Sequence, residues 1–213
     1  MGLAEASPAL SAACWTLIAF LSGSIPFSVI VGRLAARADI RDYGDHNPGA
    51  TNVLRAASWG WFVPAALLDY FKAVIPVGLA WFVVRLPGWW IVPVALAPLV
   101  GHGFSPWLRF RGGKAVAVTF GAWTGLTLGA GPMVLGMLLG LMFATVAVSG
   151  WAVVLAMLCF GGFIWRAYAS AQPELLAVWA GHLAFLIWKH RADLRQPPGI
   201  NPWLWRLVGR RAG

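Results

Sequence analysis

The sequence predicts an all-α integral membrane protein, built as a bundle of seven transmembrane helices. Only 11% of the 213 residues are charged, whereas soluble domains carry roughly 25%. Several apolar runs approach or reach the roughly 17–25 residues that cross a hydrocarbon core, and most basic residues fall between these runs. We therefore expect one transmembrane domain over residues 1–213, with no separate soluble module.

The first three predicted spans end at basic residues or at polar stretches. The first covers Ala9–Val31 and ends before Arg33. The second covers Trp59–Val84 and ends before Arg85. The third, Trp89–Gly103, is short and leads into a second polar stretch.

Residues 115–165 contain no Asp, Glu, Lys or Arg, and they predict three further spans. One helix of that length would extend about 77 Å at 1.5 Å per residue, far beyond a hydrocarbon core of roughly 30 Å. Two breaks are expected, at Gly129–Pro132 and at Ser149–Gly150, and a seventh span is predicted over Leu175–Trp188. Five spans, with part of residues 115–165 re-entrant, is the alternative.

Basic residues are distributed unevenly between the two sides that this topology defines. The polar stretches 33–55, 104–114 and 189–213 fall on one side and hold 13 of the 16 Lys and Arg residues. By the positive-inside rule this side is cytoplasmic, so the N-terminus is expected outside and the C-terminus in the cytoplasm. The same rule explains the net charge of +9, and we expect no binding to nucleic acid. Three stretches far apart in the chain could then form one site.

The first polar stretch contains GDHNPGATNVLR, which has the composition of an anion-binding loop. Gly49 allows main-chain N–H groups to approach a ligand closely. Asn47, Thr51 and Asn52 offer side-chain donors, and Arg55 offers a planar fork suited to phosphate. The alternative is an ordinary Gly/Asn turn followed by a basic residue that only sets topology.

The other two stretches offer further cationic groups. In the second, Gly112 and Gly113 precede Lys114 and a predicted helix, and a helix N-terminus with free N–H groups favours anions. The spacing is not that of a Walker loop. In the third, His190 could bond a phosphate oxygen or a substrate hydroxyl. Topological anchoring is the alternative for the second stretch, and a structural histidine for the third.

Ionisable residues also occur inside predicted spans. Asp69 and Lys72 lie three residues apart on one helical face, so we expect them to pair. His102 and His182 have apolar neighbours and are expected to bond within the bundle. No paired-cysteine or His-Glu-x-x-His motif is present, and no G-x-S-x-G nucleophile elbow. We expect no metal, no cofactor and no acyl-enzyme.

Six blocks of the sequence occur in the order typical of one known family. They are SGSIPF (22–27), VGRL (31–34), DIRDYGDHNPGATNVLR (39–55), LLDYFKAVIPV (67–77), GHGFSPWLRFRGGKAVA (101–117) and KHRADLR (189–195). The chain resembles the bacterial membrane glycerol-3-phosphate acyltransferases that use acyl phosphate as donor. The resemblance extends over nearly the whole chain.

This resemblance implies a seven-helix bundle in the bacterial inner membrane, with its active site facing the cytoplasm. It implies transfer of a fatty acyl group from acyl phosphate to the sn-1 hydroxyl of glycerol 3-phosphate, yielding lysophosphatidic acid and phosphate. Arg55 and Lys114 match the family's phosphate-binding cations, and His190 matches the histidine of its third motif. Amides near Gly112 and Gly113 are candidates to stabilise the oxyanion. We expect a monomer whose partners are the two substrates and membrane lipid.

The chain departs from the family at several positions of the expected site. Asp45 replaces a serine that contacts phosphate, Asp193 replaces an asparagine, and Ala115 replaces a glycine. Asp45 could be protonated, could pair with His46 or Arg191, or could mark a changed substrate. Two other functions therefore stay open. One is a relative that binds an anionic lipid precursor without turnover, or that acylates another acceptor; the other is a small transporter or structural membrane protein.

Overall fold

The computed structural model describes residues 7–204 of the chain. Over this range it is helical, and its strand-like pairing is one isolated antiparallel bridge between Val146 and Ile200. The chain forms two compact units that meet in sequence at Gly129 and Ala130. Residues 205–213 of the third polar stretch, and both chain ends, lie outside the described residues.

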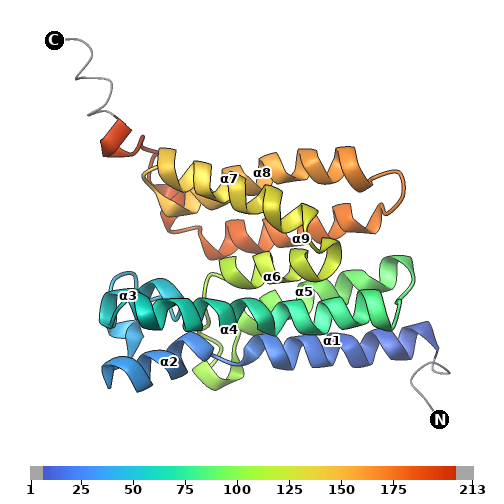
Figure 1. Cartoon of the computed structure of the whole chain (residues 1–213), viewed down its shortest axis with the longest axis horizontal. Helices are drawn as coiled ribbons and strands as arrows, with labels where there is room; N and C mark the ends of the chain where they lie inside the picture. The colour runs from blue at the N-terminus through green and yellow to red at the C-terminus, as the bar shows by residue number, and fades with distance from the viewer. Residues whose placement is uncertain (1–6, 205–213) are drawn as a thin grey trace. The chain divides into compact units, whose positions relative to one another are not determined.

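The first unit contains six α-helices and four short helical turns among its described residues. The helices are α1 Pro8–Ser24, α2 Phe27–Ala36, α3 Ala50–Ala56, α4 Trp59–Gly78, α5 Ile91–Gly103 and α6 Val116–Thr127. The turns are η1 Ile40–Asp42, the π-helical η2 Leu79–Val83, η3 Gly88–Trp90 and η4 Pro106–Leu108. Helices α1, α4, α5 and α6 run lengthwise, and α2 and α3 lie at one end (Figure 1). The first two polar stretches meet at this end.

The first predicted span is broken, because α1 ends at Ser24 and α2 begins at Phe27. Proline has no N–H to donate and disfavours a helical residue before it. Accordingly Ile25 is extended, with φ −63° and ψ 122°, in front of Pro26. The first predicted span, Ala9–Val31, therefore consists of two helices, which together form one stretch long enough to cross a membrane.

Glycines allow the long helices of the first unit to approach one another closely. A Cβ on Gly121 of α6 would lie 2.2 Å from the main-chain oxygen of Tyr70 in α4, and one on Gly101 of α5 would lie 2.3 Å from that of Phe20 in α1. Small residues at helix contacts are typical of membrane bundles, where lipid removes the hydrophobic force between helices and packing takes its place.

The described part of the second unit contains three long helices and a returning C-terminal segment. The helices are α7 Ala130–Thr145, α8 Ser149–Tyr168 and α9 Glu174–Lys189, followed by the 3₁₀ turn η5 Asp193–Arg195. Trp151 Nε1 donates to the main-chain oxygen of Gln196 at 2.7 Å, and Trp203 Nε1 donates to that of Ala144 at 2.7 Å. These indole bonds fix the segment against α7 and α8.

Within residues 7–204, four helical stretches are long and apolar enough to cross a membrane: Pro8–Ala36, Trp59–Val83, Gly88–Leu108 and Ser149–Tyr168. Helices α6 and α7 are apolar but shorter, and the uncharged run is interrupted between α6 and α7 and between α7 and α8, close to the predicted breaks. Many large apolar side chains on the helices are exposed, as lipid contact requires. The count of seven crossings and the orientation of the termini stay predictions.

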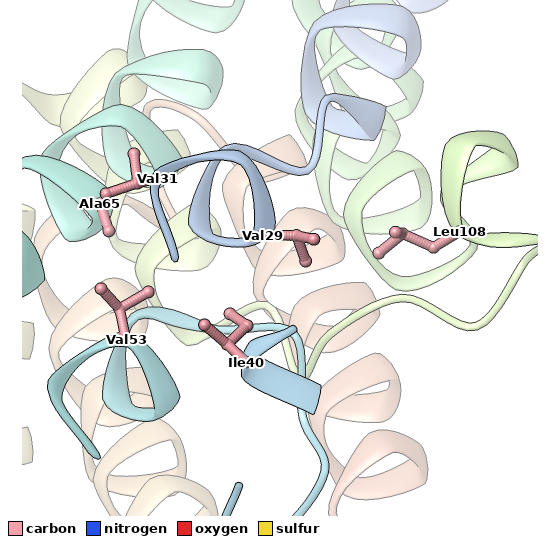
Figure 2. Close-up of a cluster of buried hydrophobic side chains, with 6 residues drawn as sticks. All are labelled: Val29, Val31, Ile40, Val53, Ala65 and Leu108. Atoms are coloured by element: carbon pink, nitrogen blue, oxygen red, sulfur yellow. The ribbon is translucent and has the colours of Figure 1, made fainter. Parts of the chain in front are cut away.

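One buried apolar cluster fixes the first two polar stretches to the helices. Figure 2 shows its members converging from α2, η1, α3, α4 and η4: Val29, Val31, Ile40, Val53, Ala65 and Leu108. Ile40 and Val53 have no exposed surface. A Cβ on Gly32 would lie 2.1 Å from Cγ2 of Ile40, so α2 needs a glycine where η1 packs on it.

Candidate functional site

The first polar stretch folds into a loop centred on the buried amide of Asn52. This side chain is 1% exposed. Its Nδ2 donates to Oδ1 of Asp45 at 3.1 Å and to the main-chain oxygen of Asn47 at 2.8 Å. Its Oδ1 accepts a hydrogen bond from Nη1 of Arg55 at 2.7 Å. One amide therefore orients both Asp45 and Arg55.

Lys114 of the second polar stretch reaches the same place. Its Nζ donates to Oδ2 of Asp45 at 2.9 Å, while Nη1 of Arg55 lies 3.5 Å from Oδ1 of that carboxylate. Two cations from separate stretches of the chain thus meet at one small anion. This is the geometry that binding of a phosphate would need.

Asp45 is ionised in this arrangement. Burial by itself would raise the pKa of its carboxyl, but the hydrogen bond and charge of Lys114, together with bonds from the Asn47 N–H and the Asn52 amide, lower the pKa below its ordinary value. Asp45 is therefore a carboxylate at neutral pH. It occupies the position between Arg55 and Lys114 with a negative charge of its own.

Two explanations for Asp45 that the sequence left open are therefore wrong. The carboxyl is not protonated, and it does not pair with His46, whose Nδ1 bonds the main-chain oxygen of Arg41 at 2.8 Å. Arg191 belongs to the second unit, where its guanidinium donates to the main-chain oxygen of Trp188 at 2.9 Å. Pairing with Arg191 and a changed substrate both stay open.

The remaining candidates of the first loop shape it or border it. Gly44 has φ +57°, and a Cβ there would lie 2.0 Å from Nη1 of Arg55. Gly49 precedes α3 as its N-terminal cap in an extended conformation. Its N–H donates to the main-chain oxygen of Asn47 at 2.8 Å. Thr51 is exposed in the first turn of α3, where its hydroxyl is accessible to a ligand.

Gly112 and Gly113 fasten the second stretch to the end of α5. The Gly112 N–H donates to the main-chain oxygen of Gly103 at 3.2 Å, and the Gly113 N–H donates to that of His102 at 3.1 Å. A Cβ on Gly112 would lie 1.9 Å from that His102 oxygen. The expectation that these two amides stand open to an oxyanion was wrong, because both donate to carbonyls. Their glycines instead allow the close approach that places Lys114.

A buried polar network supports this turn from inside the bundle. As predicted, Lys72 pairs with Asp69, with Nζ and Oδ1 2.6 Å apart. Nζ also donates to the main-chain oxygen of Ile25 at 2.8 Å and lies 2.9 Å from Nδ1 of His102, to which it is hydrogen-bonded. The Ser28 hydroxyl donates to Oδ2 of Asp69. His102 does bond within the bundle, as expected. Sequence reasoning missed Ser28, since one serine in an apolar helix gives no sign of its partner.

His102 connects the network to the glycine turn. A Cβ on Gly113 would lie 2.3 Å from Nε2 of His102, so the ring packs directly against the main chain next to Lys114. The chain of contacts runs from Asp69 through Lys72 and His102 to the turn that carries the candidate cation. Charges at such depth are costly unless paired, and here they are paired and buried.

The third polar stretch lies in the second unit. His190, at the end of α9, is 2% exposed. Its Nδ1 lies 3.1 Å from Oδ2 of Asp193, which also accepts a bond from Ser149 Oγ at 3.4 Å. A Cβ on Gly150 would lie 2.5 Å from Cβ of Asp193. Asp193, the second acidic departure, thus holds one ring nitrogen of the candidate histidine.

A known protein family matches most of the chain. The family model described as glycerol-3-phosphate acyltransferase matches residues 13–197. This chain belongs to that family. Within the family, a glycerol-3-phosphate acyltransferase of Thermus thermophilus is 37% identical over 213 residues, covering 95% of this chain and 98% of the relative. Glycerol-3-phosphate acyltransferase 1 of Thermotoga maritima is 37% identical over 196 residues, covering 84% of this chain and 94% of the relative.

Solved structures of this acyltransferase family agree with the fold. The glycerol 3-phosphate form of PlsY (YgiH), an integral membrane glycerol 3-phosphate acyltransferase, superposes with a TM-score of 0.78 at 26% identity, covering 87% of this chain and 90% of that one. Its lysophosphatidic acid form gives a TM-score of 0.76. Together with the apolar helices, this makes the chain a multi-pass membrane protein of the family.

Proposed function

We propose that this protein transfers a fatty acyl group from acyl phosphate to the sn-1 hydroxyl of glycerol 3-phosphate, giving lysophosphatidic acid and inorganic phosphate. Membership of the family supports acyl transfer to glycerol 3-phosphate. The identity of the donor, the acylated position and the product follow from the motifs that the sequence shares with the acyl-phosphate-dependent enzymes.

The observation that carries the proposal is the meeting of Arg55 and Lys114 at one carboxylate. Asp45 lies 3.5 Å from one cation and 2.9 Å from the other, so two atoms of an anion already bridge them. The phosphate of glycerol 3-phosphate would take this position and displace Asp45. Arg55 would offer a planar fork and Lys114 a point charge, and both would offset the repulsion between two anionic substrates.

Other residues of the loop are proposed to complete the phosphate site. Asn47, Thr51 and Asn52 would supply side-chain donors beside the cations, and Gly49 the close approach of the main chain. Gly112 and Gly113 would act by fixing Lys114. Asp45 would move aside or bind the glycerol hydroxyls.

The reaction itself needs little covalent participation by the protein. The hydroxyl oxygen attacks the acyl carbon, the bond from that carbon to the phosphate oxygen breaks, and inorganic phosphate leaves with the hydroxyl proton. Acyl phosphate is already activated, so positioning supplies much of the rate. His190 is proposed as a catalytic residue because it matches the histidine of the third motif. Asp193 is proposed to contribute to substrate binding because it occupies another position of the same motif.

We further propose that the protein works as a monomer in the bacterial inner membrane, with the Arg55–Lys114 site facing the cytoplasm. The positive-inside distribution of the polar stretches supports this orientation. Both substrates would then reach the site from the cytoplasmic leaflet or from the cytoplasm.

Release of phosphate from palmitoyl phosphate by the purified protein tests the proposal. Release should depend on glycerol 3-phosphate, and Lys114→Ala and Arg55→Ala should each lower kcat/KM by about tenfold or more, since each removes a charge-assisted contact. Arg166→Gln, an exposed cation at the end of α8, serves as the matched control and should leave the rate unchanged. Phosphate release that does not depend on glycerol 3-phosphate would contradict the proposed acyl transfer.

One observation favours a second candidate function. The resting site contains its own anion, Asp45, where the related enzymes are expected to carry a neutral serine. A relative that binds an anionic lipid precursor without turnover, or that acylates a different acceptor, would fit such a change. Glycerol 3-phosphate binding without phosphate release would support this candidate over the first.

A further inference from the structure

A second cationic pocket opens at the same end of the first unit, lined by residues that the proposed reaction does not use. Its volume is about 520 Å³, and it is lined by Arg33, Arg41, Trp107, Leu108, Arg109 and Arg111. Neither Arg55 nor Lys114 lines it. Four arginines from α2, η1 and the turn after η4 therefore face one space.

The pocket has a net positive charge. Among the described residues, the ion pairs of these arginines involve a single carboxylate, Asp39, whose Oδ2 lies 2.6 Å from Nη2 of Arg41 and 3.4 Å from Nη2 of Arg33. Asp42 is a second nearby carboxylate, since its charge also raises the pKa of Arg41, so four arginines and two aspartates leave a formal charge of +2. Asp39 also accepts from Nε and the main-chain N–H of Arg41, which holds one guanidinium in place.

The wall that carries Arg109 and Arg111 is built rigidly. The N–H groups of Arg109 and Arg111 donate within the turn, to the main-chain oxygens of Pro106 at 3.1 Å and Leu108 at 3.0 Å. The turn contains two consecutive residues in the left-handed backbone conformation, Arg109 at φ 52° and Phe110 at φ 61°, each at a conformational cost of roughly 1–2 kcal/mol. The two arginines are therefore presented by a fixed main chain.

The base of the turn is tied to the end of α1. Ser105 Oγ donates to the main-chain oxygen of Ser24 at 2.6 Å, and Nε1 of Trp107 donates to Ser24 Oγ at 3.2 Å. Leu108 packs into the apolar cluster of Figure 2. A pocket whose walls are already ordered loses little entropy when a ligand binds.

Apolar side chains beside the arginines indicate what kind of anion fits. Trp107 in the pocket wall is 70% exposed, Phe110 between the two arginines is 65% exposed, and Leu34 next to Arg33 is 72% exposed. Exposed tryptophan and arginine at the ends of membrane helices are typical of the headgroup layer. A soluble anion would gain nothing from these apolar groups, whereas a lipid would contact them with its glycerol and upper acyl chain.

We propose that this pocket binds the phosphate headgroup of an anionic membrane lipid, separately from the Arg55–Lys114 site. A phosphomonoester presents three oxygens and up to two negative charges, which suits a charge of +2 and planar guanidinium donors. Phosphatidic acid should therefore bind more tightly than phosphatidylglycerol, and phosphatidylcholine least. This inference concerns binding, and it stands whether or not the chain transfers acyl groups.

Native mass spectrometry of the full chain in mild detergent, titrated with each of the three lipids, tests the proposal. Arg109→Gln/Arg111→Gln should weaken phosphatidic acid binding by about tenfold or more, because charge-assisted bonds are lost. The control Arg85→Gln/Arg166→Gln removes the same charge from exposed positions outside the pocket and should bind as the unchanged protein does. Circular dichroism and thermal unfolding verify that both variants fold.

Two further measurements separate this site from the proposed active site and from free phosphate. The Arg109→Gln/Arg111→Gln variant should keep its affinity for glycerol 3-phosphate, and Lys114→Ala should keep its affinity for phosphatidic acid. Inorganic phosphate at the same concentration should not displace the lipid. Equal loss in the control variant, equal binding of phosphatidylcholine, or displacement by inorganic phosphate would each overturn the assignment.

Discussion

Replacing Asp45 by serine should tighten the binding of glycerol 3-phosphate. In the structure this carboxylate pairs with Lys114 at 2.9 Å and Arg55 at 3.5 Å, so an incoming phosphate must displace one anion and then remain beside it. Serine removes the charge and can still donate a hydroxyl to phosphate. The change would leave Arg55 and Lys114 available to pair with the phosphate of the ligand.

The size of the gain follows from charge and exposure. Two unit charges 4 Å apart interact by about 4 kcal/mol at an effective dielectric constant of 20, and by about 1 kcal/mol in bulk water. The Asp45 side chain is 44% exposed, so solvent screening places the effect near the lower value. A gain of about 1–2 kcal/mol corresponds to a dissociation constant lower by roughly 5–30-fold.

Calorimetric titration of glycerol 3-phosphate into the purified variants measures this directly. Asp45→Asn keeps the shape and removes only the charge, so it should show most of the same gain. Asp42→Asn removes an equal charge from an exposed neighbouring position and should show little. Unchanged or weaker affinity in Asp45→Ser, or an equal gain in Asp42→Asn, would refute the idea that Asp45 competes with the phosphate.

Three further predictions concern the scaffold, and thermal unfolding in detergent measures all of them. Lys72→Met leaves the buried Asp69 unpaired and should destabilise by about 3–5 kcal/mol, whereas adding Asp69→Leu should recover much of the loss. Gly112→Ala places a Cβ 1.9 Å from a main-chain oxygen and should lower the free energy of unfolding by about 1–3 kcal/mol or more. Gly140→Ala, whose Cβ would have nothing within 4 Å, should raise it by about 0.5–1 kcal/mol. Hydrogen bonds from Arg41 hold the pKa of Asp39 well below its ordinary value, so the stability that the ionised carboxylate adds is present above about pH 4 and is lost as the pH falls further. Asp39→Asn should lack this acid-dependent part of the stability. Parallel profiles of stability against pH in both proteins would contradict this.

Local patterns in the sequence predicted much of the scaffold. The uncharged run is interrupted near the predicted glycine-rich positions because a helix longer than the bilayer must turn, and glycine and proline mark where it can. Asp69 and Lys72 pair because their three-residue spacing places them on one helical face. These inferences needed only spacing and composition, which a sequence states directly.

The site could be predicted less completely, because its contacts join residues far apart in the chain. Arg55 and Lys114 were recognisable as cations, yet nothing in the sequence shows that Asp45 lies between them. His102 was expected to bond somewhere in the bundle, but its partner Lys72 follows only from the packing of α4 against α5. Pro26 could have indicated the break between α1 and α2, because proline at that position opposes a continuous helix.

The contact of Gly121 with Tyr70 ties the placement of Lys114 to a position deep in the bundle. Gly121 lies five residues beyond Val116, the first residue of α6, about 7.5 Å along the helix, and its missing side chain sets how near α6 stands to α4. A methyl group there would act as a wedge and tilt the two helices apart at their loop end. Substitutions at this α4–α6 contact should therefore change the affinity for substrate, although they lie away from Arg55 and Lys114.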